Sequence, residues 1–164
     1  MIKDKLSTTN RSNGRIQGNL ERELEANREP TIDQYHVINY HPFSINSSYQ
    51  AEINDKGEPY LTDTPAFKKW KSNFPYGWTM PSKKEMNVDF NKPIRIHFYY
   101  DHLDKFDRSN FDKSAQDMIF KFYRADDQVV WETGVSKTNK HVDSYDDGKI
   151  YFYLENIEVE DIAI

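Results

Sequence analysis

The sequence predicts an α/β protein of a single domain, with helices packed on a mixed β-sheet. Three observations lead to this class. The length of 164 residues suits one domain with one hydrophobic core. Apolar and polar side chains alternate over 94–100, which is the pattern of a strand. Apolar side chains recur at helical spacing over 111–122, and two further strands are expected over 128–137 and 149–154.

The first 30 residues differ in character from the rest of the chain. They are polar and charged, and they show no pattern of core residues. Residues 7–18 are rich in Ser, Thr, Asn and Gly, a composition typical of disorder. We therefore expect a partly disordered extension over 1–30, followed by one folded domain over 31–164.

The folded domain is expected to begin with a strand over 35–40, where aromatic and β-branched residues gather. The polar segment 44–49 that follows is expected to be a loop. Its Asn46 and Ser47 side chains either complete a turn or approach a phosphate group. A short strand is expected over 59–61.

A helix is predicted over 65–74, because Thr64 is a good N-cap and Pro65 follows it at the first helical position. The basic side chains on this helix either form a solvated face or contact phosphate groups; they are Lys68, Lys69 and Lys71. Residues 76–90 show no periodicity and are expected to form a long loop.

The central helix is predicted from Asn110 to about Phe122. Ser109 is expected to be its N-cap, in an arrangement close to a capping box with Asp112. One apolar stripe is expected to face the core: Phe111, Ala115, Met118, Ile119 and Phe122. A polar line lies roughly opposite, formed by Asn110, Lys113 and Asp117.

Aspartates flank this helix on both sides. Asp107 precedes it, while Asp126 and Asp127 follow it at the start of the next predicted strand. Carboxylates in such a cluster can hold Mg²⁺ or Mn²⁺ for phosphodiester hydrolysis. Since neighbouring strand residues point to opposite faces, one of Asp126 and Asp127 is expected to bind metal. Asp117 is either a further ligand or the i+4 ion-pair partner of Lys113.

This stretch resembles the RusA-type Holliday junction resolvases, which are small dimeric endonucleases, often encoded by phages or prophages. The matching residues are Asp107, Asn110, Lys113, Asp117, Asp126, Asp127, Gln128, Val129, Val130 and Lys137. The likeness extends to residues 40–46 and 61–71, so that it covers about 34–155. In one departure, Ser109 stands where many members of the family have an aspartate.

The resemblance implies a RusA-like nuclease that cuts four-way or branched DNA as a homodimer, with Mg²⁺ or Mn²⁺ as cofactor. It implies that Asp107 and Asp127 bind the metal and favours a catalytic role for Lys113 at the scissile phosphate. Asn110 either orients the site or belongs only to the helix start, and no catalytic role is expected for Ser109. Two alternatives stay open: a non-catalytic protein that binds branched DNA, and a phage-type protein-interaction module.

The formal net charge of −5 is unevenly distributed. The 24 C-terminal residues carry seven acids and one lysine, a net charge of −6, so the remainder sums to +1. Residues 60–95 carry seven Lys or Arg against three acids, which leaves a basic region for DNA. The chain has no cysteine, its five histidines form no zinc pattern, and no apolar run could span a membrane, so we expect a cytoplasmic protein.

Overall fold

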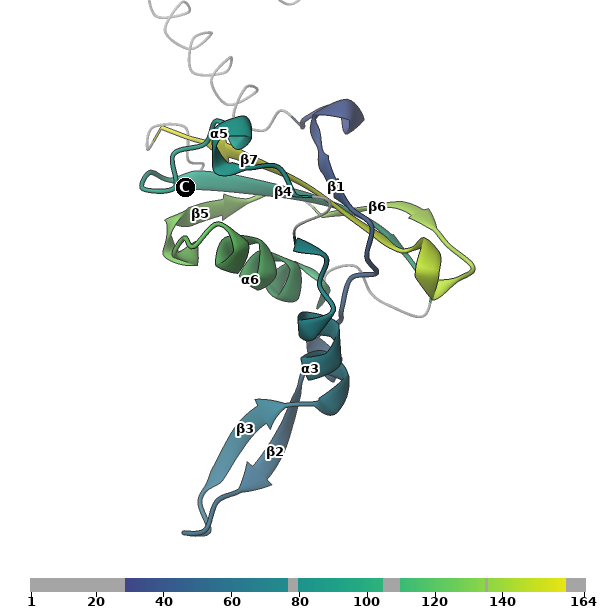
Figure 1. Cartoon of the computed structure of the whole chain (residues 1–164), viewed down its shortest axis with the longest axis vertical. Coiled ribbons are helices and arrows are strands. Elements are labelled where there is room, and N and C mark those ends of the chain that lie inside the picture. Colours follow the sequence, from purple (N-terminus) through teal and green to yellow (C-terminus); the bar gives the residue numbers. More distant parts are fainter. Residues whose placement is uncertain (1–28, 77–79, 105–109, 135, 159–164) are drawn as a thin grey trace, which may run out of the picture.

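The computed structural model describes residues 29–76, 80–104, 110–134 and 136–158. A twisted sheet forms the body, with helix α6 (Asp112–Phe122) on one of its faces. A hairpin and helix α3 (Pro65–Ser72) project away from this body (Figure 1). Among the described residues, no helix has the length and apolar character that a membrane crossing requires. The predicted extension over 1–30 lies outside the described residues, apart from its last two.

The main sheet has the strand order β1-β7-β4, and both β5 and β6 pair with the far side of β4. β7 runs antiparallel to β1 and β4, while β5 and β6 run parallel to β4. This confirms the predicted α/β class with a mixed sheet. The strands are β1 His36–Ile38, β4 Ile94–His102, β5 Val130–Thr133, β6 Lys137–His141 and β7 Lys149–Asn156.

Helix α6, Asp112–Phe122, is the crossover that two parallel strands require. It begins two residues later than predicted, and Phe111, the residue before it, makes no side-chain cap. The Asp112 carboxylate instead accepts hydrogen bonds from the Tyr100 hydroxyl, at 2.6 Å, and from Ser136 Oγ, at 2.5 Å. The predicted capping box is therefore wrong, because burial against the sheet directs Asp112 away from the helix start. Ser109 lies outside the described residues.

The single strand predicted over 128–137 is also wrong. Residues Asp127–Val129 form a 3₁₀ turn, η4, and the strand that follows is divided into β5 and β6. The division falls next to Gly134, whose amide donates to the Ile96 carbonyl at 2.7 Å. A Cβ at Gly134 would lie 2.3 Å from Nδ1 of His97, so a larger residue here would displace the buried His97 side chain of β4.

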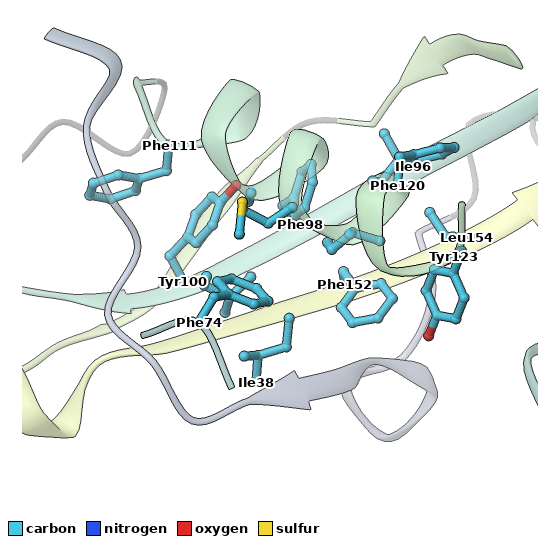
Figure 2. Packing of buried hydrophobic residues seen from close by; sticks show 14 of the residues in the cluster. Ile38, Phe74, Ile96, Phe98, Tyr100, Phe111, Phe120, Tyr123, Phe152 and Leu154 are labelled. Carbon is cyan, nitrogen blue, oxygen red and sulfur yellow. The ribbon is translucent and has the colours of Figure 1, made fainter. Parts of the chain in front are cut away.

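The core lies between the sheet and α6, where the side chains of β4 and β7 meet the helix (Figure 2). Phe111, Ala115, Met118 and Ile119 are buried as predicted. Phe122 is only partly buried, and Phe120 is buried instead. Arg95 and His97, the polar residues of the alternating pattern on the opposite face of β4, are also buried.

Buried Arg95 connects three strands. Its guanidinium donates to Glu155 of β7 at 2.8 Å and to Glu132 of β5 at 3.0 Å. His97 Nε2 lies 3.3 Å from the same Glu155 oxygen. Paired charges explain how a strand with alternating polarity is buried on both faces.

Helix α3, Pro65–Ser72, begins where predicted: Thr64 Oγ1 accepts a hydrogen bond from the Phe67 amide at 3.2 Å. A second strand pair precedes it, made of β2, Tyr49–Ile53, and β3, Pro59–Asp63. β2 was not predicted. The loop predicted over 76–90 also contains a short helix, α5, Lys83–Met86, which Ser82 caps through the Glu85 amide.

Candidate functional site

Three charged side chains meet where α6 and η4 lie together. Lys113 Nζ lies 2.7 Å from Asp117 Oδ1 and 3.8 Å from Asp127 Oδ2. The hydrogen bond to Asp117 is the main reason that the pKa of Lys113 is raised, and Asp127 adds to it. All three side chains are at least one-third exposed, so this cluster is open to solvent and to a ligand.

Local helix geometry accounts for two members of this cluster. Lys113 and Asp117 are four residues apart, so they lie on the same face of α6. Their ion pair is one of the two roles that the sequence left open for Asp117. The third member, Asp127, comes from beyond the end of the helix, and its position depends on how the chain turns there.

The turn after α6 is a Schellman motif. The Ala125 amide donates to the Phe120 carbonyl at 3.0 Å, and the Arg124 amide donates to Lys121 at 3.2 Å. Arg124 adopts the left-handed conformation, with φ of 52°, that usually calls for glycine. The motif reverses the chain tightly, and this reversal returns Asp127 to the side of Lys113.

The two adjacent aspartates have different surroundings. Asp126 is the N-cap of η4, and its Oδ1 accepts a hydrogen bond from the Gln128 amide at 3.0 Å. Asp127 is the first residue of that turn and directs its carboxylate toward Lys113. The expectation that they occupy opposite faces of a strand is wrong, because neither residue is in a strand. The turn separates their roles instead.

An open depression of about 340 Å³ lies beside this cluster. Its lining residues are Asp117, Phe120, Lys121, Ala125, Asp126 and Asp127. The sequence analysis did not single out Lys121. A signal was present, since Lys113, Asp117 and Lys121 follow one another at intervals of four along one helix face.

Tyr49, at the start of β2, also approaches the cluster, and its phenol contributes to the raised pKa of Lys113. The preceding segment is held to α6 by a hydrogen bond of 2.6 Å from Ser114 Oγ to the Phe43 carbonyl. Tyr49 was missed at the sequence level, because its approach depends on the unpredicted strand β2.

The predicted phosphate-binding residues lie in two places. Asn46 and Ser47 are exposed in the 3₁₀ turn η2, Ile45–Ser47, where the Ser47 carbonyl accepts from Thr64 Oγ1 at 2.7 Å. On α3, Lys71 pairs with Asp63 and lies 4.5 Å from the centre of the Phe67 ring. Lys68 and Lys69 on the same helix are exposed to solvent.

The described part of the predicted metal site offers two convergent carboxylates. Asp107 lies outside the described residues, and Asn110 is partly buried just before α6. No group of three acidic or histidine side chains that could hold a metal occurs among the described residues. Mg²⁺, however, commonly takes one or two carboxylates and completes its shell with water and phosphate oxygens. Asp117 and Asp127, which already share the positive charge of Lys113, fit that requirement.

Comparisons with known proteins give no support for or against a metal-dependent nuclease. No model of a known protein family matches the chain, and no curated protein has a significantly similar sequence. The sequence pattern and the arrangement of Lys113, Asp117 and Asp127 are therefore the observations that bear on function.

Proposed function

We propose that the protein is a Mg²⁺-dependent endonuclease that cleaves branched DNA, four-way junctions among its substrates, and that Mn²⁺ can replace Mg²⁺. The supporting observation is the exposed position of Lys113 Nζ between the carboxylates of Asp117 and Asp127. Two carboxylates and one ammonium group, open to solvent, are the groups that bind a divalent cation and a phosphate together.

Each member of the cluster has a distinct role in this proposal. Asp117 and Asp127 would hold the metal, which supplies an activated water and offsets charge at the phosphate. With the two carboxylates engaged in that way, the Lys113 ammonium is available to a phosphate oxygen and stabilises the negative charge that develops there. Asp126 keeps η4 in shape and so positions Asp127.

The proposal includes a homodimer. The described part of one chain carries one such cluster, whereas a four-way junction offers two symmetry-related strands to be cut. A twofold dimer supplies two sites related by the same symmetry. The basic stretch 60–95, with exposed Lys68 and Lys69, provides contacts to the DNA backbone in this scheme.

Cleavage of a synthetic four-way junction tests the proposal. The wild-type protein should nick the junction with Mg²⁺ and not with EDTA, and it should leave a linear duplex of the same sequence largely intact. Binding without cleavage over the full range of Mg²⁺ concentrations would instead favour a protein that recognises branched DNA without cutting it. Ser109 stands where many RusA-type resolvases have an aspartate, and this difference favours that second candidate.

A further inference from the structure

The β2–β3 hairpin, hereafter the arm, projects from the body beyond α3 (Figure 1). All five residues of β2 are exposed, and Ile53 and Leu61 have exposed fractions of 72% and 73%. An isolated two-stranded hairpin is only marginally stable in water. The arm therefore shows an apolar surface and two strand edges to whatever lies beside it.

The register of the arm sorts its side chains into two faces, because directly opposed residues of an antiparallel pair point the same way. The polar face carries Gln50, Glu52, Tyr60 and Thr62, and there the Tyr60 hydroxyl donates to Glu52 at 2.8 Å. The other face carries Tyr49, Ala51, Ile53, Pro59, Leu61 and Asp63 and is mostly apolar.

The hydrogen bonds show which backbone groups of β2 point outward. The Asn54 amide donates to the Glu58 carbonyl at 3.0 Å, and the Thr64 amide donates to the Ser48 carbonyl at 2.9 Å. Hydrogen-bonded and non-hydrogen-bonded pairs alternate along an antiparallel ladder, so the even-numbered residues of β2 face β3. The amides and carbonyls of the odd-numbered residues, 49, 51 and 53, therefore point away from β3.

We propose that this outer edge of β2 pairs with the same edge of a second copy of the chain, about a twofold axis at Ala51. Ala51 then opposes Ala51 of the second copy, while Tyr49 opposes Ile53 and Gln50 opposes Glu52. All the outward amides and carbonyls of the strand find partners. An aromatic side chain meets a β-branched one, and an amide meets a carboxylate, both favourable cross-strand pairs.

Other registers and edges are less suitable. A twofold axis at Glu52 would oppose two like charges. On the outer edge of β3, the corresponding pairing would centre on Leu61, but there Pro59 has no amide to donate, and Asp63 is already paired with Lys71. The β5–β6 edge of the main sheet is interrupted at Gly134. Within the described chain, β2 therefore offers the most continuous edge for a second copy.

Charge supports the same arrangement. Between Tyr49 and Asp63 the chain carries four acids and one lysine. Antiparallel pairing at Ala51 brings the tip of each arm, with Asp55 and Glu58, beside the base of the other arm. At that base α3 begins, and it carries exposed Lys68 and Lys69. Opposite charges thus meet at both ends of the four-stranded sheet.

Paired cysteine variants test this interface in the full-length chain, which has no cysteine of its own. Across the proposed axis, the Cα atoms of two Ala51→Cys chains lie about 5.5 Å apart, within the range of about 4.4–6.8 Å that a disulfide needs. Leu61→Cys is the matched control on the same face, because its two copies are three strand spacings, about 14 Å, apart. Mild oxidation should convert most of the Ala51→Cys protein to a covalent dimer and leave the Leu61→Cys protein monomeric.

A second measurement uses charge. Light scattering should give twice the monomer mass for the wild type and the monomer mass for Ala51→Lys, which places two like charges at the axis. Gln50→Lys adds the same charge one residue away, opposite Glu52 of the second copy, and should keep the dimer.

Cross-linking of Leu61→Cys as complete as that of Ala51→Cys, or a dimer that Ala51→Lys leaves intact, would overturn the inference. It gives the homodimer of the proposed function its interface, but the two are tested separately. A dimer that cuts no DNA would contradict the nuclease alone, whereas cleavage by a chain that shows no Ala51 cross-link would contradict the interface alone.

Discussion

The body and the arm of this protein differ in where their strands obtain their stability. In β4 every residue except Tyr99 is buried, whereas in β2 every residue is exposed. β4 lies between β7 and the β5–β6 edge and packs against α6, while β2 has one strand neighbour and packs at its base, where Tyr49 meets the Phe67 ring at 5.8 Å. Among the described residues, β4 thus has strand neighbours on both sides, whereas the outer edge of β2 has none.

This difference predicts that the stability of the protein and its proposed functions depend on different parts of the chain. The cluster of Lys113, Asp117 and Asp127 lies on the body, where α6 and the Schellman turn hold it. Tyr49, at the base of the arm, lies near enough to that cluster to help raise the pKa of Lys113. Substitutions in the body should therefore act on folding, those in the cluster on chemistry, and those in the arm on association.

The largest effect on stability should come from the centre of β4. Phe98→Ala removes a fully buried ring and should lower the free energy of unfolding by about 3–5 kcal/mol. Leu61→Ala is the matched control in the arm and should change it by less than about 0.5 kcal/mol. Denaturant titration of the wild type and both variants measures these changes in the free energy of unfolding. Equal losses would show that the arm is packed as tightly as the body.

Lys113→Met should have a large effect on chemistry and almost none on folding. Its ion pair with Asp117 is exposed and contributes only about 0.3–0.5 kcal/mol to stability. Loss of a group that stabilises transition-state charge should slow junction cleavage about 10²–10³-fold. Single-turnover cleavage rates measure the catalytic contribution of Lys113, and thermal melts measure its contribution to stability. A variant that cuts at the wild-type rate would contradict a catalytic role for Lys113.

An intermediate, pH-dependent effect is expected at Glu155. Burial alone would raise its pKa, but hydrogen bonds from His97 and Arg95 outweigh burial and hold the pKa below its usual 4.5. The unfolded chain therefore binds a proton at Glu155 more readily than the folded chain does. The stabilisation of the folded state by ionised Glu155 is complete above pH 4.5 and is lost as the pH falls through the folded-state pKa.

Glu155→Gln tests this assignment. The variant should be less stable than the wild type by about 1–3 kcal/mol near neutral pH, because buried Arg95 loses an ionised partner. The difference should narrow as the pH falls below 4.5, and melting temperatures between pH 7 and pH 3 measure it. A difference that stays constant over this range would mean that the charge of Glu155 does not contribute.

Local signals in the sequence predicted part of this structure. The start of α3 was recognised because Thr64 is a strong N-cap and proline is favoured at the first helical position. β7 was recognised because its apolar run follows the turn residues of 146–148. The apolar spacing of α6 located the helix, although Asp112 turned to Tyr100 and Ser136 instead of capping it. In each case, the residues near in sequence carried enough information to identify the element.

Other features depend on contacts between distant residues. The division of the strand at Gly134 follows from the approach of His97, and the position of Asp127 follows from a left-handed Arg124, which lacks the usual glycine signal. β2 was missed although polar and apolar side chains alternate over 49–53, because five residues next to a polar loop give only a short and weak strand signal. The helical spacing placed Lys113 and Asp117 on one face of α6. The approach of Asp127 to Lys113 depends on the Schellman turn, which the sequence did not reveal.

Two matched substitutions test most directly whether Asp127 acts in metal-dependent cleavage and Asp126 in local structure. Asp127→Asn removes a ligand charge at nearly constant shape, whereas Asp126→Asn keeps a good cap for η4. Nicking of a four-way junction in saturating Mg²⁺ is measured beside gel-shift affinity. We predict that Asp127→Asn abolishes cleavage and retains binding, while Asp126→Asn cuts at close to the wild-type rate. Cleavage by Asp127→Asn at the wild-type rate would contradict the account.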